Sequence, residues 1–352
     1  MSALPSPAAQ APSLRIDYAA APLERLLAAD DILAVFGFGA AAPVHYDPRY
    51  LRVMLEPFGA APFEVWRGQA PVARGLDDGV AWAEDGALQF GAIEIDEPAG
   101  DADRTPGDIG TGQSSGDIGA AAETAYRRLI AFTSARGYPH LLRVWNYFDA
   151  ITQGDGDDER YRRFCLGRGN GLRASADDLD PTALPAATAI GRVDGGRRLQ
   201  LYWLAARTPG TPLENPRQLS AYRYPRQYGP QPPSFARAML PPARAAMPLL
   251  LSGTAAIVGH ESRHADSLAT QLDETLANID CLLAVARAQR PSLPARLGPH
   301  SRLKVYVRER EQLAQVAALL DARLGPDVPR IVLHAQVCRR ELRIEIDGVH
   351  DL

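Results

Sequence analysis

Residues 249–288 read LLLSGTAAIVGHESRHADSLATQLDETLANIDCLLAVARA, and this stretch decides the fold of the second half of the chain. Its first ten residues form a short apolar run, which predicts a buried strand over 249–258. Leu268, Leu272, Ile279 and Leu283 then fall close to one face at helical spacing, which predicts a long amphipathic helix over 266–288.

The same alternation of strands and helices extends in both directions from this stretch. It predicts two related halves, each a mixed sheet with helices on one face, and therefore an α/β (α+β) fold. The cleft between two such halves is a natural place for a ligand pocket. In the second half we expect strands 303–308, 330–337 and 341–346 and a helix over 311–324; in the first half, helices 120–136 and 158–166 and strands 141–148 and 198–205.

Composition shifts divide the chain into segments. Residues 1–14, rich in Ala, Pro and Ser, are expected to be a disordered tail. Residues 15–208 are expected to form an N-terminal α/β domain that carries a mobile loop over 97–119, where Gly, Asp, Ser and Pro dominate. A proline-rich stretch then opens the C-terminal domain, residues 209–352.

Overall composition narrows the function classes. The 352 residues are 46% hydrophobic and 23% charged with a net charge of -4, which disfavours a nucleic-acid binder. No apolar stretch approaches the roughly 20 residues of a membrane span, and residues 1–13 do not show the basic start and apolar run of a secretory signal. Cys165, Cys281 and Cys338 show no paired spacing. We therefore expect a cytoplasmic protein with no nucleic-acid or membrane partner.

Two short motifs suggest other chemistry. His260 and His264 belong to an H-E-x-x-H match, with Glu274 or Asp280 as a third zinc ligand. Arg263 lies inside the match, however, and the match falls between a strand and a helix, so no metal site is expected. The glycines of GRGNG, residues 167–171, do not complete a dinucleotide-binding fingerprint and are interpreted as turn glycines.

Arginines cluster near aromatic residues in RVWNYFDAITQGDGDDERYRRFCLGR, in SAYRYPRQY and at the end of LKVYVRE. Such a set suits a dicarboxylate, because a guanidinium binds a carboxylate through two parallel hydrogen bonds. A solvated helix face is the alternative for any single arginine. In ELRIEID, Glu345 alternates with apolar residues, a pattern that predicts a half-exposed strand with one polar face.

Longer stretches carry a resemblance to a known family. RVWNYF, ERYRRFCLGRG, ENPRQLSAYRYPRQYGP, SGTAAIVGHESRH and CRRELRIEIDGV together resemble the chorismatase family from about Arg143 to the C-terminus. The resemblance implies that the C-terminal domain, residues 209–352, is the catalytic half and is similar to the RidA (YjgF) fold. It implies chorismate as substrate and no cofactor. It also implies Glu345 as the acid that protonates the enolpyruvyl methylene, and Arg308 as the ligand of the enolpyruvyl carboxylate. Arg160, Arg163 and Tyr224 are expected in the rest of the substrate pocket.

Two positions bear on the product. Hydrolytic members of the family resemble S-A-T-A where this chain has Ser252-Gly253-Thr254-Ala255. Aromatising members have glycine at the second position, as Gly253 is here, and a cysteine seven residues before the acid, as Cys338 is here. Seven residues is an odd separation along a strand, so the two side chains share a face only if a turn at Arg339-Arg340 intervenes. The expected product is 3-hydroxybenzoate, with 4-hydroxybenzoate as a candidate co-product. The alternatives are a hydrolytic chorismatase giving a dihydroxycyclohexadiene carboxylate and a non-catalytic RidA-like metabolite-binding module; a monomer and a trimer both stay open.

Overall fold

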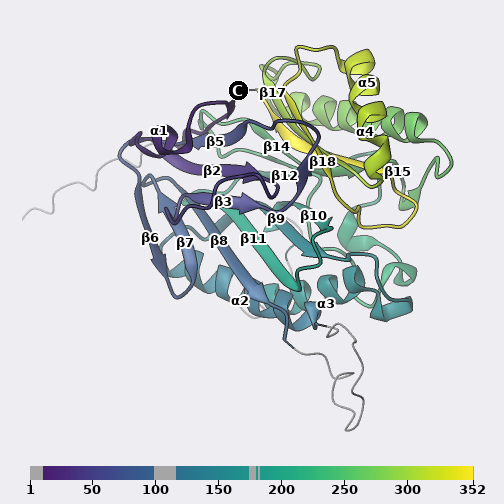
Figure 1. Cartoon of the computed structure of the whole chain (residues 1–352), viewed down its shortest axis with the longest axis horizontal. Helices are drawn as coiled ribbons and strands as arrows, with labels where there is room; N and C mark the ends of the chain where they lie inside the picture. Colours follow the sequence, from purple (N-terminus) through teal and green to yellow (C-terminus); the bar gives the residue numbers. More distant parts are fainter. Residues whose placement is uncertain (1–10, 99–115, 174–179, 181–182, 352) are drawn as a thin grey trace, which may run out of the picture.

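The computed structural model describes residues 11–98, 116–173, 180 and 183–351. Three β-sheets form the body of the molecule, and the four longest helices lie on its outside (Figure 1). Residues 1–10 of the expected tail and residues 99–115 of the expected mobile loop lie outside the described residues.

The N-terminal segment forms a small four-stranded sheet in the order β1-β5-β2-β3. Its central strand β2 is the apolar run ILAVFGF, and every residue of it is buried. The bounds are β1 (Arg15–Ala19), α1 (Leu23–Leu27), β2 (Ile32–Phe38), β3 (Tyr50–Val53), β4 (Glu56–Pro57) and β5 (Phe63–Arg67).

A six-stranded sheet in the order β10-β9-β11-β8-β7-β6 follows. Helices α2 and α3 pack on one face of it, and Asp117 caps α2 by accepting hydrogen bonds from the amides of Gly119 (2.9 Å) and Ala120 (3.1 Å). The bounds are β6 (Ala73–Asp77), β7 (Val80–Glu84), β8 (Leu88–Asp96), α2 (Ile118–Ala135), β9 (His140–Asp149), α3 (Arg160–Arg173), β10 (Ala186–Arg192) and β11 (Arg198–Ala206).

The C-terminal part forms a seven-stranded sheet in the order β12-β13-β14-β19-β17-β18-β4, with α4 and α5 on one face. A two-stranded hairpin of β15 and β16 projects from the end of β14. The bounds are β12 (Thr211–Leu213), β13 (Ala238–Leu240), β14 (Leu249–Ala255), β15 (Ile257–Val258), β16 (Glu261–Ser262), α4 (Leu268–Gln289), β17 (Ser301–Val307), α5 (Leu313–Leu324), β18 (Arg330–His334) and β19 (Ile344–His350).

The two larger sheets share one topology. The order β10-β9-β11-β8-β7-β6 corresponds strand for strand to β18-β17-β19-β14-β13-β12. In each sheet a parallel pair (β9 with β10, β17 with β18) adjoins a late antiparallel strand, β11 or β19, that returns through the middle. The prediction of two related α/β halves, each with helices on one face, is therefore confirmed.

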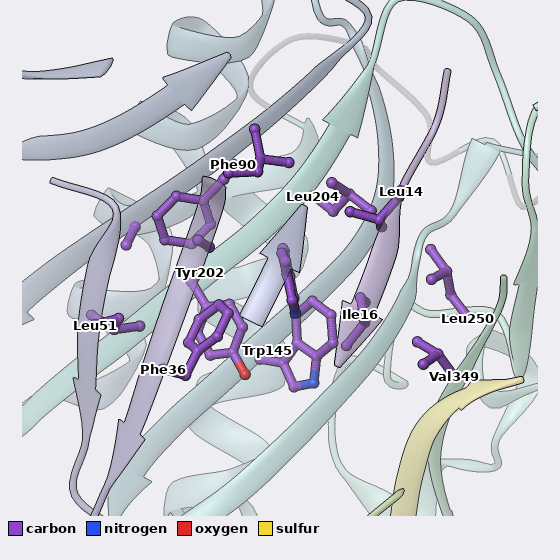
Figure 2. Packing of buried hydrophobic residues seen from close by; sticks show 14 of the residues in the cluster. Leu14, Ile16, Phe36, Leu51, Phe90, Trp145, Tyr202, Leu204, Leu250 and Val349 are labelled. Carbon is purple, nitrogen blue, oxygen red and sulfur yellow. The ribbon is translucent and has the colours of Figure 1, made fainter. Parts of the chain in front are cut away.

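The faces without helices meet in a shared core (Figure 2). Trp145 and Tyr202 of the six-stranded sheet stack with ring centroids 4.7 Å apart, and Phe36 of the small sheet packs against Tyr202. Leu250 and Val349 of the seven-stranded sheet belong to the same cluster. Because the core draws on all three sheets, the two halves are held face to face, with their helices outward.

Three expected segment boundaries need correction. The tail does not extend to residue 14: Leu14 is 3% exposed, and its amide donates to the carbonyl of Ala246 at 2.9 Å. The division at 208/209 is also not strict, since β4 of the N-terminal part pairs with β18 and becomes an edge of the C-terminal sheet. The expected loop ends at Asp117, because α2 already begins at Ile118.

The glycines of residues 167–171 are not turn glycines, as α3 runs through them to Arg173. A Cβ on Gly167 would lie 2.8 Å from the carbonyl carbon of Gly119, and one on Gly171 would lie 2.6 Å from Cβ of Tyr126. Glycine is needed here because α3 lies against α2 at backbone distance, a tertiary constraint that no local pattern reveals.

Candidate active site

A cavity of about 200 Å³ lies between the two halves. One side of it comes from β10 and α3 of the first half, and the other from β14, β19 and the loop before β19. The segment between β12 and β13 closes the remaining side. The lining residues are Glu159, Tyr161, Arg162, Arg168, Ala187, Thr188, Ala189, Tyr224, Tyr228, Pro233, Phe235, Arg237, Gly253, Ala255, Ile257, Cys338, Arg339, Arg340, Glu341 and Glu345.

Three glutamates line the cavity, Glu159, Glu341 and Glu345, and of these Glu345 is the buried one. It lies on β19 and is only 5% exposed. Burial, and next the nearby carboxylate of Asp347, raise the pKa of its carboxyl to about 8. Among the described residues the Glu345 carboxyl makes no hydrogen bond or ion pair. A carboxyl with this pKa is still protonated at neutral pH and is suited to general-acid work.

The polar face of β19 is buried, whereas the sequence predicted a half-exposed strand. All seven residues of the strand are buried. The strand also begins at Ile344 rather than at residue 341. The reason is the duplication: the first half covers the face that a lone sheet would turn to solvent, so period-two alternation here separates two buried faces.

Gly253 lies beside the acid in an irregular part of β14. Between the pairs Leu251↔Gly348 and Thr254↔Ile346, β14 has two residues, Ser252 and Gly253, where β19 has only Asp347. This is a β-bulge, a feature that re-aims side chains next to active sites. A Cβ on Gly253 would lie 2.9 Å from Cδ of Glu345 and closer still to its Oε1. The carboxyl therefore occupies space that only glycine leaves open.

Cys338 lines the cavity from the loop between β18 and β19. A turn at Arg339 and Arg340 follows it, closed by a 3.1 Å hydrogen bond from the Leu342 amide to the Arg339 carbonyl. The expected turn is present, and Cys338 and Glu345 face one cavity. Burial, and next the charge of Glu345, raise the pKa of the Cys338 thiol, which keeps the thiol protonated.

Arg308 holds this loop and does not line the cavity. Its guanidinium donates to three backbone carbonyls of the loop, those of Leu342 (2.8 Å), Val337 (2.6 Å) and Arg339 (2.6 Å). Through these hydrogen bonds, Arg308 stabilises the segment that carries Cys338. The structure thus gives Arg308 contacts that differ from the expected carboxylate contact.

Arg160 and Arg163 also lie outside the cavity lining. Arg160 is 7% exposed and pairs with Glu97 through two hydrogen bonds of 2.9 and 2.5 Å. The Arg163 side chain is 44% exposed and pairs with Asp117 at 3.1 Å. Of the four expected substrate ligands, Tyr224 alone lines the cavity, and its hydroxyl accepts a 2.8 Å hydrogen bond from Arg237.

The cavity contains cationic side chains that the sequence did not single out as ligands. Arg168 on α3 is 2% exposed, and its Nε and one Nη find no hydrogen-bond partner among the described residues. Arg237 is 4% exposed, and its Nε is likewise unpaired within the described part of the chain. Buried unpaired guanidinium groups are costly, and an anionic ligand would satisfy them. Arg168 belonged to a quoted arginine cluster, but only its burial sets it apart.

A third arginine, Arg339, lies over the rings of Tyr228 (4.2 Å) and Tyr224 (5.3 Å). Its guanidinium also donates to the carbonyl of His260 at 2.8 Å. Aromatic rings and a backbone carbonyl thus fix its position at the edge of the cavity.

The two histidines of the H-E-x-x-H match have separate surroundings. Nδ1 of His260 lies 3.1 Å from the Tyr228 hydroxyl, whereas Nε2 of His264 lies 3.3 Å from Oε2 of Glu274. The match spans the β15–β16 hairpin instead of a helix. In the ranges 11–98, 116–173, 180 and 183–351, His, Cys, Asp and Glu side chains form no group of three suited to a metal ion. Within the same residues, no helix is long and apolar enough to cross a membrane.

The fold and the cavity define a duplicated α/β enzyme whose acid lies between its halves. Comparison with known proteins identifies its family. A family profile described as "Chorismatase FkbO/Hyg5-like, N-terminal" matches residues 64–205. A "Chorismatase" of Streptomyces rapamycinicus is 36% identical over 292 residues, covering 81% of each chain. A "3-hydroxybenzoate synthase" of Streptomyces hygroscopicus is 34% identical over 299 residues, covering 82% of each chain.

A solved structure agrees with these relatives. The crystal structure of a chorismatase superposes with a TM-score of 0.80 at 32% identity, covering 98% of this chain and 100% of that one. The chain belongs to the chorismatase family, and the resemblance found in its sequence is confirmed.

Proposed function

We propose that this enzyme removes pyruvate from chorismate and releases 3-hydroxybenzoate, with 4-hydroxybenzoate as a candidate co-product. The observation that carries the proposal is the buried carboxyl of Glu345, whose pKa of about 8 keeps it protonated. The same cavity holds guanidinium nitrogens that find no hydrogen-bond partner among the described residues. The names of the relatives, "Chorismatase" and "3-hydroxybenzoate synthase", support the same reaction.

Glu345 has the properties that the first step requires. An enol ether is cleaved after protonation of its terminal methylene carbon, a slow transfer that needs a positioned acid. The Glu345 carboxyl gives its proton to that carbon, the carbon–carbon π pair forms the new C–H bond, and an oxocarbenium ion results. The ionised carboxylate then stabilises the cation in a site shielded from water.

Aromatisation completes the reaction without water. The bond between the ring and the ether oxygen breaks, and that oxygen leaves as the keto oxygen of pyruvate. Loss of one ring proton to Glu345 makes the ring aromatic and restores the acid. The hydroxyl already on the ring gives 4-hydroxybenzoate if it stays in place, and 3-hydroxybenzoate if its oxygen moves to the carbon that carried the ether.

Arg168 and Arg237 are the proposed ligands of the two substrate carboxylates. Both line the cavity, both are nearly fully buried, and both have nitrogens without a hydrogen-bond partner in the described part of the chain. Each carboxylate bound there gains charge-assisted hydrogen bonds. Tyr224 orients Arg237 through its hydroxyl, and Arg308 acts indirectly by ordering the Cys338 loop.

Gly253 and Cys338 support the aromatising reaction over hydrolysis. The space at Gly253 is filled by the Glu345 carboxyl, so the acid stands where an alanine methyl group would exclude it. The position of the acid relative to the ring affects whether a water oxygen or the ring's own hydroxyl oxygen attacks the ring. Cys338 adds an uncharged thiol on the same side of the cavity.

The test is to incubate the purified chain with chorismate and to separate the products by liquid chromatography with mass detection. Pyruvate with hydroxybenzoate, without added water, supports the proposal, and the isomer ratio defines the subtype. Pyruvate with a product one water heavier would mean hydrolysis to a dihydroxycyclohexadiene carboxylate. Chorismate binding by calorimetry with no pyruvate released would mean a binding module.

A further inference from the structure

Asp347 is a buried carboxylate two residues after Glu345 on β19, on the same face of the strand. It is the single residue of β19 that lies opposite the two bulge residues of β14, Ser252 and Gly253. Its side chain is 0% exposed and is not part of the cavity lining. Its place at the bulge nevertheless connects it to both Gly253 and Glu345.

Donors from both halves hold the Asp347 carboxylate. Its Oδ2 accepts hydrogen bonds from Thr188 (2.7 Å), Trp145 (3.0 Å), Tyr306 (3.0 Å) and Arg143 (3.2 Å). Thr188, Trp145 and Arg143 belong to β10 and β9 of the first half, whereas Tyr306 belongs to β17 of the second. A carboxylate with this many donors has a fixed position, and it joins the halves directly behind the acid.

Thr188 transmits this position to the bulge. Its hydroxyl oxygen accepts from the amide of Gly253 at 3.0 Å and from Arg143. Because both of those partners are donors only, the Thr188 hydroxyl hydrogen is directed to Asp347. The hydrogen-bonded sequence runs from the Gly253 amide through Thr188 to Asp347, and it fixes the backbone against which the Glu345 carboxyl lies.

Arg143 is held in the same way. It is fully buried, lies over the Trp145 ring at 4.3 Å and donates to both Thr188 and Asp347. It is one of the cations whose charge favours the ionised form of Glu345. Because the negative charge of Asp347 lies next to Arg143, it reduces the positive potential that Arg143 exerts at Glu345, and the pKa of Glu345 stays raised.

We propose that Asp347 is a positioning residue for the reaction: through Thr188 it fixes the Gly253 bulge, and by pairing with Arg143 it withholds that cation from the Glu345 carboxyl. This inference rests on the proposed function for its kinetic test, though not for its titration test. The pH dependence is set by the titratable and charged groups that surround Glu345 and Asp347. Those around Glu345 are Arg143, Tyr161, Arg237, Arg308, Cys338 and Asp347. Those around Asp347 are Tyr18, Arg143, Tyr147, Tyr202, Lys304, Tyr306 and Glu345.

The test compares Asp347→Asn with the matched control Glu64→Gln in the full chain. Asparagine keeps the shape and one acceptor oxygen but removes the charge. Glu64 is a buried carboxylate of the same network, paired with Lys304 at 3.0 Å, and it is not one of the charges that shift the pKa of Glu345 most strongly. In Asp347→Asn we expect the high-pH limb of kcat/KM to move down by about one pH unit or more. In Glu64→Gln we expect that limb to stay in place.

A second measurement needs no substrate. Glutamate labelled with ¹³C at Cδ reports the titration of Glu345, and a Glu345→Gln variant assigns its signal. We expect the titration midpoint to fall in Asp347→Asn. An unchanged midpoint, or equal changes in Asp347→Asn and Glu64→Gln, would overturn the inference even if chorismate is converted. A lowered midpoint in an enzyme that leaves chorismate intact would support Asp347 and refute the proposed function.

A further variant covers the case in which Asp347→Asn does not fold. Thr188→Val removes the hydroxyl and leaves both charges in place. We expect kcat to fall about 10-fold with a smaller change in KM, because the acid and not the carboxylate ligands would be displaced. Thr188→Ser should restore kcat. A wild-type kcat in Thr188→Val would contradict the proposal that Thr188 connects Asp347 to the Gly253 bulge.

Discussion

Gly253 and Glu345 share one space across β14 and β19: a methyl group on residue 253 would lie 2.9 Å from Cδ of the glutamate and overlap its Oε1. The β-bulge at residues 252–253 brings the glycine to this position, and Thr188 holds it there through the Gly253 amide. The location of the acid is thus set by the absence of a side chain on a neighbouring strand.

Gly253→Ala is expected to displace the Glu345 carboxyl. A shift of about 1 Å at a reacting group can cost about 100-fold in rate, so hydroxybenzoate formation should fall by that order. Any remaining turnover should shift towards the product one water heavier. Chromatography with mass detection measures both effects.

The matched control for this substitution is Gly298→Ala. Gly298 has no neighbour nearer than 4.0 Å to an added Cβ and no positive φ, so the control should leave turnover unchanged. Equal losses in both variants would assign the effect to folding instead of to the acid.

The halves could be predicted from the sequence because strand and helix periodicities are local. Helix 266–288 was expected and α4 spans Leu268–Gln289; helix 120–136 was expected and α2 spans Ile118–Ala135. The face-to-face packing could not be predicted in this way. Alternation in ELRIEID shows which residues share a face, but it does not show that a second sheet buries both faces.

The site was predictable only in part, for a related reason. The acid, the glycine and the cysteine were found through long matching stretches, and all three line one cavity. The arginines that line the cavity were not identified in this way, because an arginine's partner depends on which carboxylates and carbonyls the fold brings near it. Arg160 meets Glu97 from 63 residues away, whereas Arg168 on the same helix meets no such partner for two of its nitrogens.

Glu345→Gln is expected to abolish turnover while the fold survives. A positioned general acid contributes about 100- to 10,000-fold, and glutamine cannot donate a proton to carbon. In the wild type, kcat/KM should fall as the pH rises through about 8, because the carboxyl then loses the proton it must give. A pH series of initial rates checks both statements, and near-normal activity of the variant would refute the assignment of the acid.

The same substitution should change how stability depends on pH. The folded state binds the Glu345 proton up to about pH 8, whereas the unfolded chain releases it near the ordinary glutamate value. Between these limits the folded state holds more protons, so this group lowers the unfolding free energy as pH rises, by about 1.4 kcal/mol per pH unit. Glutamine removes that dependence.

Denaturant unfolding of both proteins at pH 5, 6, 7 and 8 (an interval that lies roughly within those limits) measures this difference. We expect the stability of Glu345→Gln relative to wild type to increase along the series. A constant difference would mean that the carboxyl titrates near its ordinary value in the folded protein, and the proposed acid would then be ionised at neutral pH.

Arg168→Met is expected to raise KM for chorismate by about 10- to 100-fold, the loss of charge-assisted hydrogen bonds worth about 1.5–3 kcal/mol. Methionine fills a similar volume, and Arg168 has no ion-pair partner among the described residues, so removing its buried charge should not lower the melting temperature of the free enzyme. Arg163→Met, on the same helix, is the control. Its side chain is 44% exposed and pairs with Asp117, so steady-state kinetics should stay close to wild type. The reverse result would restore Arg163 as the substrate ligand.

Cys338→Ala is expected to alter the ratio of 3- to 4-hydroxybenzoate more than the overall rate. The thiol lines the cavity beside Glu345, and its raised pKa keeps it uncharged, so it acts through shape and weak hydrogen bonding and not as a nucleophile. Iodoacetamide should therefore modify Cys338 slowly at neutral pH, which mass spectrometry of digested protein can follow. Product chromatography of the variant gives the ratio. An unchanged ratio would mean that Cys338 is a packing residue and that Gly253 is the position that selects the product. A thiol that does not touch the substrate ring cannot direct where the ring's hydroxyl oxygen moves.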